Sequence, residues 1–575
     1  MADTVRRSEA FAFLAGLPLV GVAATACVAT LQLLSGMQLR SATCVLIAGL
    51  VTLLIFFAVR RSFQKLGTAD FAMLSGLTLV FCAASFFLAT KIYDVSYDGQ
   101  TYHYEAVRQL VSGWNYLVPP SYPAPREEMA YTAPFLTHYC KLPWLLEAVV
   151  AQLSGTIEGA KCIHPLLLWS AFWSCLAWFV RLRIRFEVGA LVALACALNP
   201  VSVTQAPTFY VDGLFASTIT ALVSQIGLWL TLPSAFSTAT LGATLLLALN
   251  LKFTSTVAAG LLCAIVLGCV LWGRARGYDR SPSDRTMIGL SLFAAFCVFG
   301  VGFQPFVTNW AATGNVFYPI PQYDLPGKTV DSPAIQQMQI PKNLQDEGRF
   351  MKLALSLFSE SANPLGDTPA SLKLPFEMKR KEFQIFRDPD VRVAGFGPVF
   401  TLSILIALLA AAFSLCSRSG SNSFSSCAQL YFRLGIPIWI VLSVLVVPES
   451  WWARYVPQLW LLPLLLSLQV LEQQNSSRGL AFQTFLSGLS VVLVTANSVA
   501  IGFVSWSSAY TRSAALKAEL SEIAAEGRAV EVTFNRFRAN EERLRHFGVN
   551  FAEVPVPICD APRLLLESPT SICSK

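Results

Sequence analysis

The feature that most constrains this chain is its series of long apolar runs. About 20 mostly apolar residues are enough to cross the hydrocarbon core of a bilayer, and thirteen apolar segments, two of them clearly shorter than this, can be placed along the 575 residues. Charged residues make up only 13% of the chain, about half of the roughly 25% typical of soluble domains. We therefore expect an all-α polytopic membrane protein, with spans near residues 10–34, 41–59, 70–90, 163–180, 187–200, 213–231, 239–251, 254–272, 286–306, 395–416, 429–447, 455–471 and 480–504.

Basic residues gather in short segments that alternate with these spans. Because cytoplasmic loops carry an excess of Lys and Arg, the pattern predicts a multi-pass protein of the plasma (inner) membrane with a cytoplasmic N-terminus. The same pattern explains the net charge of +7 without a nucleic-acid partner, since no basic run alternates with aromatic residues. The four clusters that this orientation places on one side are residues 6–7, 60–65, 181–185 and 274–285.

This orientation divides the chain into a bundle and three extracytoplasmic parts. Residues 1–69 supply two additional spans, and residues 70–504 form a transmembrane core with outer segments at about 91–162 and 307–394. The apolar stretch from Leu142 to Leu153 is too short to span, so we expect a juxtamembrane helix there, either interfacial or re-entrant. The tail 505–575 alternates helix and strand patterns and predicts a small C-terminal α/β domain. Its Cys559 and Cys573 could form a disulfide if the tail lies outside.

Acidic residues are rare, so their placement is informative. Asp94 and Asp98 directly follow the third span, together with Tyr102 and His103. A carboxylate at this membrane surface can act as a general base, or it can hold a cation that neutralises a phosphate leaving group. The alternative is a solvated loop of the interfacial aromatic belt, in which His103 is a hydrogen-bonded structural residue. The scattered histidines provide no metal-ligand spacing, which leaves open whether a divalent cation takes part.

Further candidates lie at other predicted outer turns. Asp212 precedes the sixth span, where a carboxylate needs a partner or a cavity, or else serves as the N-cap of that helix. Lys252 lies between two apolar runs and could bind a lipid phosphate or extend to the membrane surface as a snorkelling lysine. Arg454 and Tyr455 also precede a span, although Glu449 could simply pair with Arg454.

Together these motifs resemble the GT-C superfamily of membrane glycosyltransferases, the bacterial relatives (family 39-like) of the protein O-mannosyltransferases and of the lipid A aminoarabinose transferase. The resemblance covers residues 70–504 and depends on short motifs in matching order and on one side of the membrane. They are Asp98-Gly-Gln-Thr-Tyr102-His103, Pro143-Trp-Leu-Leu-Glu147, the Asp212 turn, Lys252 and Arg454-Tyr455-x-Pro457. The chain departs from the family in its two extra N-terminal spans, in Gly99-Gln100, and in the single acid of the second motif.

The resemblance implies a GT-C-like bundle and inverting transfer of a sugar from a polyprenyl-phosphate donor to an envelope glycan, lipid or protein at the outer face. It assigns Asp98 as catalytic base and Asp212 as the second acidic residue of the catalytic site, which would support acceptor or metal binding. Lys252 and Arg454 would bind the donor phosphate. Asp94, Tyr102, His103, Glu147 and Tyr455 would complete the substrate site. A transporter or flippase of a lipid-linked sugar is the alternative, which would require ionisable residues within spans and repeat symmetry; a glycan polymerase or ligase is a third reading.

Overall fold

The computed structural model describes residues 2–118, 132–278, 282–319, 339–416, 426–472, 481–557, 559 and 562–574. It is 72% helical, with a small sheet near the C-terminus. Within these ranges, nine helical segments are long and apolar enough to cross a membrane. They are α1 (Ala2–Leu34), α2 (Ser41–Val59), α3 (Thr68–Lys91), α7 (Ile163–Arg181), α10 (Asp212–Thr231), α12 (Phe253–Ala275), α13 (Asp284–Phe296) with its π-helical extension η5 (Cys297–Val301), α19 (Cys427–Leu430) continued by η9 (Tyr431–Gly435) and α20 (Ile436–Val446), and α22 (Ala481–Ala525).

Each of the thirteen predicted spans coincides with a helix, but four of these helices are short. A helix of 12 residues is about 18 Å long, well below the roughly 30 Å of a hydrocarbon core. The expected number of 13 spans is therefore not confirmed by length alone. The short apolar helices in the described ranges are α8 (Phe186–Ala197), α11 (Ala235–Asn250), α18 (Phe400–Cys416), α21 (Leu461–Leu471) and the predicted juxtamembrane helix α6 (Leu142–Ser154).

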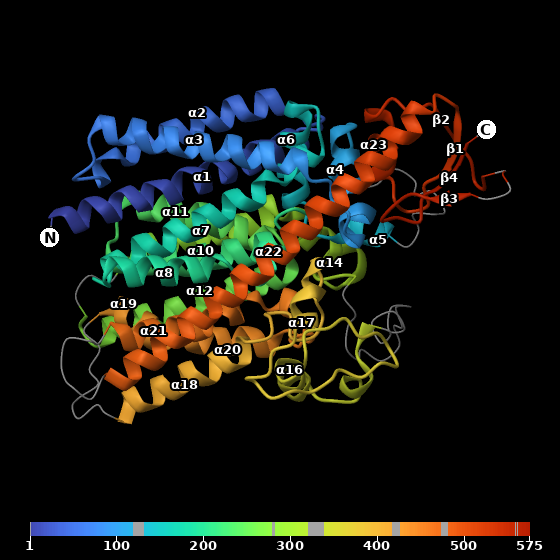
Figure 1. Ribbon diagram of the computed structural model, residues 1–575. Coiled ribbons are helices and arrows are strands. Elements are labelled where there is room, and N and C mark those ends of the chain that lie inside the picture. The colour runs from blue at the N-terminus through green and yellow to red at the C-terminus, as the bar shows by residue number, and fades with distance from the viewer. Residues whose placement is uncertain are drawn as a thin grey trace.

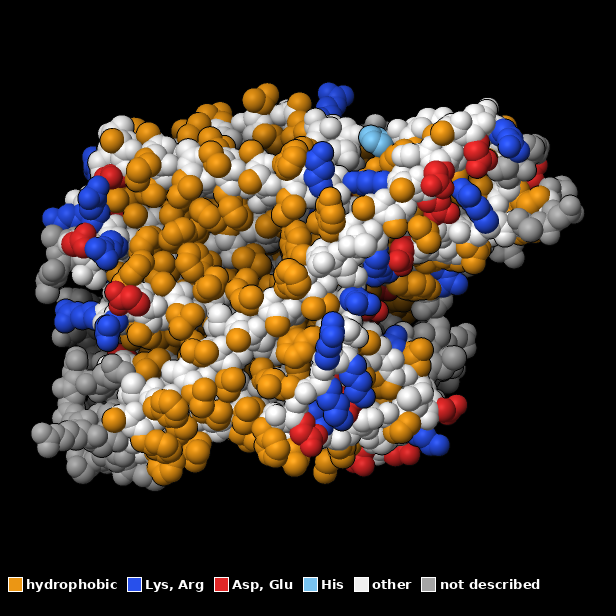
Figure 2. Space-filling view, viewed as in Figure 1, with side chains coloured by type: hydrophobic (Ala, Val, Ile, Leu, Met, Phe, Trp, Pro, Cys, Tyr) orange, Lys and Arg blue, Asp and Glu red, His pale blue; other side chains and the backbone are white. Residues whose placement is uncertain are grey.

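The helices pack side by side into one bundle, with apolar side chains over the middle of its surface and charged side chains towards its two ends (Figures 1 and 2). Two of the basic clusters meet at the end that holds the N-terminus. The Arg6 guanidinium lies 2.8 Å from the Asp70 carboxylate at the start of α3, and Arg181 Nε donates to Ser8 Oγ at 2.9 Å. The bundle therefore has one end rich in short basic loops.

Short helices and connecting segments form the opposite end of the bundle, where the C-terminal sheet also lies (Figure 1). The predicted outer segments 91–162 and 307–394 supply most of them, apart from residues 119–131 and 320–338, which lie outside the described ranges. The short helices described in these segments are η2 (Gly99–His103), α4 (Tyr104–Val111), α5 (Ala133–His138), η4 (Glu158–Cys162), α14 (Thr308–Thr313), η7 (Lys342–Leu344), α16 (Arg349–Leu357), α17 (Arg380–Gln384) and η8 (Ile385–Arg387). Elsewhere the chain forms η1 (Arg60–Ser62), α9 (Pro200–Gln205), η6 (Phe303–Val307), η10 (Ala453–Tyr455) and η11 (Pro457–Trp460).

Helix α22 carries the chain without interruption from the bundle into the C-terminal domain. It is 45 residues long and crosses the boundary expected at residue 505, so the first part of the predicted tail is the end of this helix. The predicted α/β tail is present as β1 (Val530–Thr533), α23 (Ala539–His546), β2 (Phe551–Glu553), β3 (Arg563–Leu564) and β4 (Ser571–Ser574). The sheet order is β2-β1-β4-β3, with β1 parallel to β2 and antiparallel to β4. A disulfide joins Cys559 to Cys573.

Helix α10 lies at the centre of the bundle, and the side chains of its first 19 residues are buried. Apolar residues dominate it, and Gln225 links it to two neighbouring helices: its Nε2 donates to Ser174 Oγ at 2.9 Å, and its Oε1 accepts from Thr240 Oγ1 at 2.9 Å. Gly227 allows close approach, because a Cβ there would lie 2.2 Å from the Trp178 ring. This tight packing fixes the position of Asp212, the first residue of α10.

Candidate active site

A cavity of about 830 Å³ opens at the end of the bundle away from the basic loops. This volume is near the upper end of the roughly 300–1,000 Å³ of small-molecule sites. The 23-residue helix α12 begins beside the cavity at Lys252 and ends near Arg274, so about 34 Å of helix separates the two ends. Of the nine site residues predicted from sequence, seven line the cavity: Asp98, Tyr102, His103, Asp212, Lys252, Arg454 and Tyr455.

Asp98 is presented by a tight turn between α3 and η2. Asp94 organises this turn, since its Oδ1 accepts hydrogen bonds from the backbone N–H and the hydroxyl of Ser96, at 2.8 and 2.6 Å. Glycine is required at position 99, where a Cβ would lie 2.0 Å from Asp94 Oδ2. The Asp98 side chain is 21% exposed; its Oδ2 accepts from Arg454 Nη1 at 3.2 Å. Its Oδ1 accepts no hydrogen bond from any described residue, so one carboxylate oxygen is open to a ligand.

Asp94 and Glu147, both predicted to bind substrate, lie outside the cavity lining. Asp94 is buried, and its Oδ2 accepts the backbone N–H of Phe209 at 2.7 Å. Burial raises the pKa of Asp94, against the effect of the Lys161 ammonium. Glu147 is fully buried within α6, with Oε1 3.5 Å from His164 Nε2. Both side chains therefore face protein in this structure, and their positions give no support for the substrate-binding role.

Asp212 and Lys252 form an ion pair across the cavity wall. Asp212 Oδ2 also accepts from Gln205 Nε2 at 3.4 Å, and the Lys252 ammonium lies 4.3 Å from the centroid of the Tyr455 ring. The alternative role of Asp212 as an N-cap is wrong, because the N-cap of α10 is Val211 and makes no side-chain cap hydrogen bond. Lys252 is held at the cavity rather than extended to solvent, with its side chain 18% exposed.

Arg454 lies at the centre of the charged groups. Its Nε is 3.4 Å from Asp390 Oδ1, while its Nη1 contacts Asp98, and its guanidinium lies over the Trp452 ring with 4.2 Å to the centroid. Glu449, the partner considered from sequence, accepts a hydrogen bond from Trp451 Nε1. Although burial opposes the charge, the pKa of Arg454 is raised well above its ordinary value by the neighbouring acidic groups, Asp390 foremost. The guanidinium is thus a fixed positive charge in the cavity.

His103 is oriented by α6. Trp144 Nε1 donates to His103 Nδ1 at 2.8 Å, so the proton of the neutral ring resides on Nε2. Burial lowers the pKa of His103 to about 3. The imidazole is therefore neutral and offers a hydrogen-bond donor rather than a base. The Tyr102 ring packs against it at a tilt of 36°, with ring centroids 4.2 Å apart.

Sequence reasoning missed several cavity residues. Asp388 and Asp390 come from the second outer segment, and Phe537 and Glu567 come from the C-terminal domain. Burial raises the pKa of Asp390 to about 7; the carboxylates of Asp98 and Asp388 act in the same direction, against the guanidinium of Arg454. The Asp388-Pro389-Asp390 sequence was the available signal, but carboxylates are common in a polar segment of this kind.

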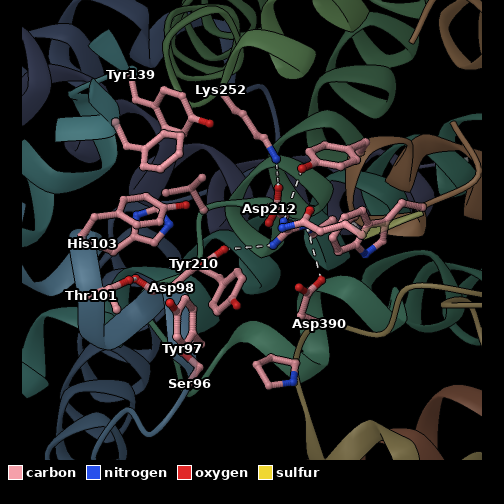
Figure 3. Close-up of a pocket in the computed structure, with 18 of the residues that line it drawn as sticks. Ser96, Tyr97, Asp98, Thr101, His103, Tyr139, Tyr210, Asp212, Lys252 and Asp390 are labelled. Atoms are coloured by element: carbon pink, nitrogen blue, oxygen red, sulfur yellow. Dashed lines mark hydrogen bonds and ion pairs between the residues drawn. The ribbon is translucent and has the colours of Figure 1, made fainter. Parts of the chain in front are cut away.

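Figure 3 shows how the labelled residues surround the cavity: Lys252 and Tyr139 lie on one side, Ser96, Tyr97 and Asp390 on the other, and Asp98 and Asp212 between them. Within the described ranges, no group of three His, Cys, Asp or Glu side chains is arranged to hold a metal ion. No protein-family model matches this chain, and comparison with curated proteins and with solved structures finds no match either.

Proposed function

We propose that this chain is an inverting glycosyltransferase that moves a sugar from a polyprenyl-phosphate donor to a cell-envelope acceptor. The observation that carries the proposal is the convergence of one open carboxylate oxygen, on Asp98, with two fixed cations, Arg454 and Lys252, in one cavity at the end of a bundle of apolar helices. We place this end outside the plasma membrane, since the basic clusters lie at the other end.

The side chains supply what such a transfer requires. Asp98 Oδ1 takes the proton from an acceptor hydroxyl, and the acceptor oxygen attacks the anomeric carbon of the donor from the face opposite the phosphate. The bond between the anomeric carbon and the phosphate oxygen breaks with inversion, and the electron pair leaves on the polyprenyl phosphate. Lys252 and Arg454 stabilise the charge that develops on that phosphate. Both cations lie against the largely buried wall of the cavity, where an electrostatic contact with the phosphate is stronger than in water.

Asp212 takes a different role in this proposal from the one predicted by resemblance. Its two oxygens already contact Lys252 and Gln205, so it holds the ammonium in position and does not need to touch the reacting atoms. The apolar residues Leu251 and Phe253, on either side of Lys252, line the cavity, and so does Val447. They suit the first isoprene units of a donor whose prenyl chain lies in the bilayer.

The decisive experiment replaces Asp98 by Asn in the full-length protein. We expect D98N to reduce sugar transfer at least 100-fold, the upper end of the typical contribution of a general base being about 10⁴, with normal membrane insertion. The matched control is D346N, which removes an exposed carboxylate outside the cavity and leaves transfer unchanged. Wild-type activity in D98N would refute the assignment, as would transfer from a nucleotide sugar alone. Movement of intact donor across a vesicle membrane without transfer would favour the flippase.

A further inference from the structure

The two sides of the cavity differ in the kinds of side chain that line them. On the side of Lys252 the lining is cationic and apolar, as a prenyl phosphate requires. The other side, marked in Figure 3 by Tyr97 and Asp390, is built mainly from carboxylates and neutral hydrogen-bonding groups. Asp98 lies between the two sides, so a molecule held on the second side would present its nucleophile to the open oxygen of Asp98.

The C-terminal domain forms part of this second side. Phe537, Glu567, Ser568 and Pro569 all line the cavity, although they lie more than 400 residues from Asp98 in the chain. Helix α22 adds Arg512, which pairs with the Glu567 carboxylate through Nε at 2.7 Å. The C-terminal domain therefore forms one wall of the cavity.

Buried polar contacts fix this wall to the turn that carries Asp98. Arg543 donates to the backbone carbonyl of Asp94 at 2.6 Å, to Gln100 Oε1 at 2.8 Å and to Glu158 Oε1 at 2.5 Å. In the opposite direction, Gln100 Nε2 donates to the backbone carbonyl of Glu567 at 3.0 Å. The segment that carries Asp98 and the backbone at Glu567 are thus held together by these hydrogen bonds.

The second side suits an uncharged, hydroxyl-rich ligand. Three carboxylates (Asp388, Asp390 and Glu567) can accept hydrogen bonds from hydroxyl groups. Three guanidinium groups face them: Arg512 is paired with Glu567, Arg454 lies 3.4 Å from Asp390, and Arg392 lies 5.5 Å from the Trp452 ring centroid. The charges on this side are therefore balanced, so the lining offers an ionic acceptor no net electrostatic attraction.

Tyr97 adds an aromatic surface to the same side. Its ring is 53% exposed and lines the cavity, and its hydroxyl accepts from Arg536 Nη1 at 2.9 Å, which holds the ring in place. An aromatic face combined with hydrogen-bond acceptors fits the apolar face and the hydroxyl rim of a sugar ring.

We propose that the C-terminal domain and the segment around Asp388 form the acceptor subsite, and that the acceptor is a neutral glycan. The inference rests on the proposed glycosyltransferase function and specifies its acceptor. The volume of about 830 Å³ leaves room for acceptor sugars beside the donor's sugar phosphate.

The test uses the purified full-length protein, a radiolabelled polyprenyl-phosphate sugar, and separated envelope fractions containing neutral polysaccharide, phospholipid or protein. We expect the label to enter the polysaccharide fraction. The isosteric variants D388N and E567Q should raise the KM for the polysaccharide at least fivefold and change the KM for the donor less than twofold. The control V556A alters a side chain of the same domain that is 73% exposed and outside the cavity, and it should leave both KM values unchanged.

Two results would overturn the acceptor assignment while the proposed function survives. One is Asp98-dependent label in the phospholipid or protein fraction, and the other is an unchanged KM for polysaccharide in both D388N and E567Q. Absence of label from every fraction with the wild-type protein would instead refute the glycosyltransferase function, and the acceptor subsite with it.

Discussion

Asp390 gives the cavity a dependence on pH that can be calculated. Its carboxyl lies 3.4 Å from Arg454, the cation that we expect to bind the donor phosphate. Burial raises the pKa of Asp390 to about 7, supported by Asp98 and Asp388 and opposed by Arg454 and Arg392. The group is therefore neutral below pH 7 and charged above it. In the charged form, Asp390 competes with the phosphate for the same guanidinium.

The size of the effect follows from this competition. A carboxylate and a phosphate about 7 Å apart repel by roughly 2 kcal/mol at an effective dielectric constant of ~20, so donor binds mainly when Asp390 is neutral. The apparent Kd then equals the intrinsic Kd divided by the neutral fraction. That fraction falls from about 0.9 at pH 6 to about 0.1 at pH 8, which predicts a roughly tenfold weaker binding of donor at pH 8.

The assay is donor affinity measured between pH 6 and 8 for the wild-type protein and for D390N. A polyprenyl-phosphate sugar is suitable because a phosphodiester keeps a single charge throughout this range. The wild type should lose affinity about tenfold as the pH rises, whereas D390N, which is neutral at every pH, should be flat. A flat wild-type profile, or the same slope in D390N, would refute this reasoning.

Two further predictions concern the C-terminal domain. Replacing Arg543 by Met leaves the buried Glu158 carboxylate without this partner and should cost about 3–5 kcal/mol, seen as a lower melting temperature in detergent. The control R545M changes a side chain that is 58% exposed and should lower the free energy of unfolding by less than about 1 kcal/mol. Equal losses of stability in the two variants would contradict a stabilising role for the buried contacts of Arg543. The disulfide between Cys559 and Cys573 closes a loop with a sequence separation of 14. Such a bond should add about 3 kcal/mol to the free energy of unfolding. A reductant should therefore destabilise the wild-type protein but not the Cys559→Ser/Cys573→Ser variant, and an unaffected wild type would argue against the bond.

The fold was largely predictable because apolar run length is a local property. Every predicted span coincides with a helix, and the tail forms a small sheet with a helix, as its alternating pattern predicted. What run length could not decide is which short helices cross a bilayer, since α8 and α21 have only 12 and 11 residues. The uninterrupted helix through residue 505 was also missed, because a change in composition there resembles a domain boundary.

The site was predictable only in part, for a physical reason. A carboxylate or cation near hydrocarbon is costly unless it has a partner, which marked Asp98, Asp212, Lys252 and Arg454. The same reasoning marked Asp94, whose oxygens accept hydrogen bonds from backbone and hydroxyl groups; sequence does not distinguish such a carboxylate from one open to a ligand. The contributions of the C-terminal domain depend on contacts such as Arg543–Gln100, separated by 443 positions.

The length of helix α22 restricts how the C-terminal domain can move relative to the bundle. At 45 residues it is about 68 Å long, more than twice the thickness of a hydrocarbon core, and it contains no proline to kink it. A stiff rod that begins in the bundle and ends against the sheet (Figure 1) offers no hinge between them. If the proposed function holds, the C-terminal domain therefore keeps its position relative to the bundle while the cavity binds its substrates.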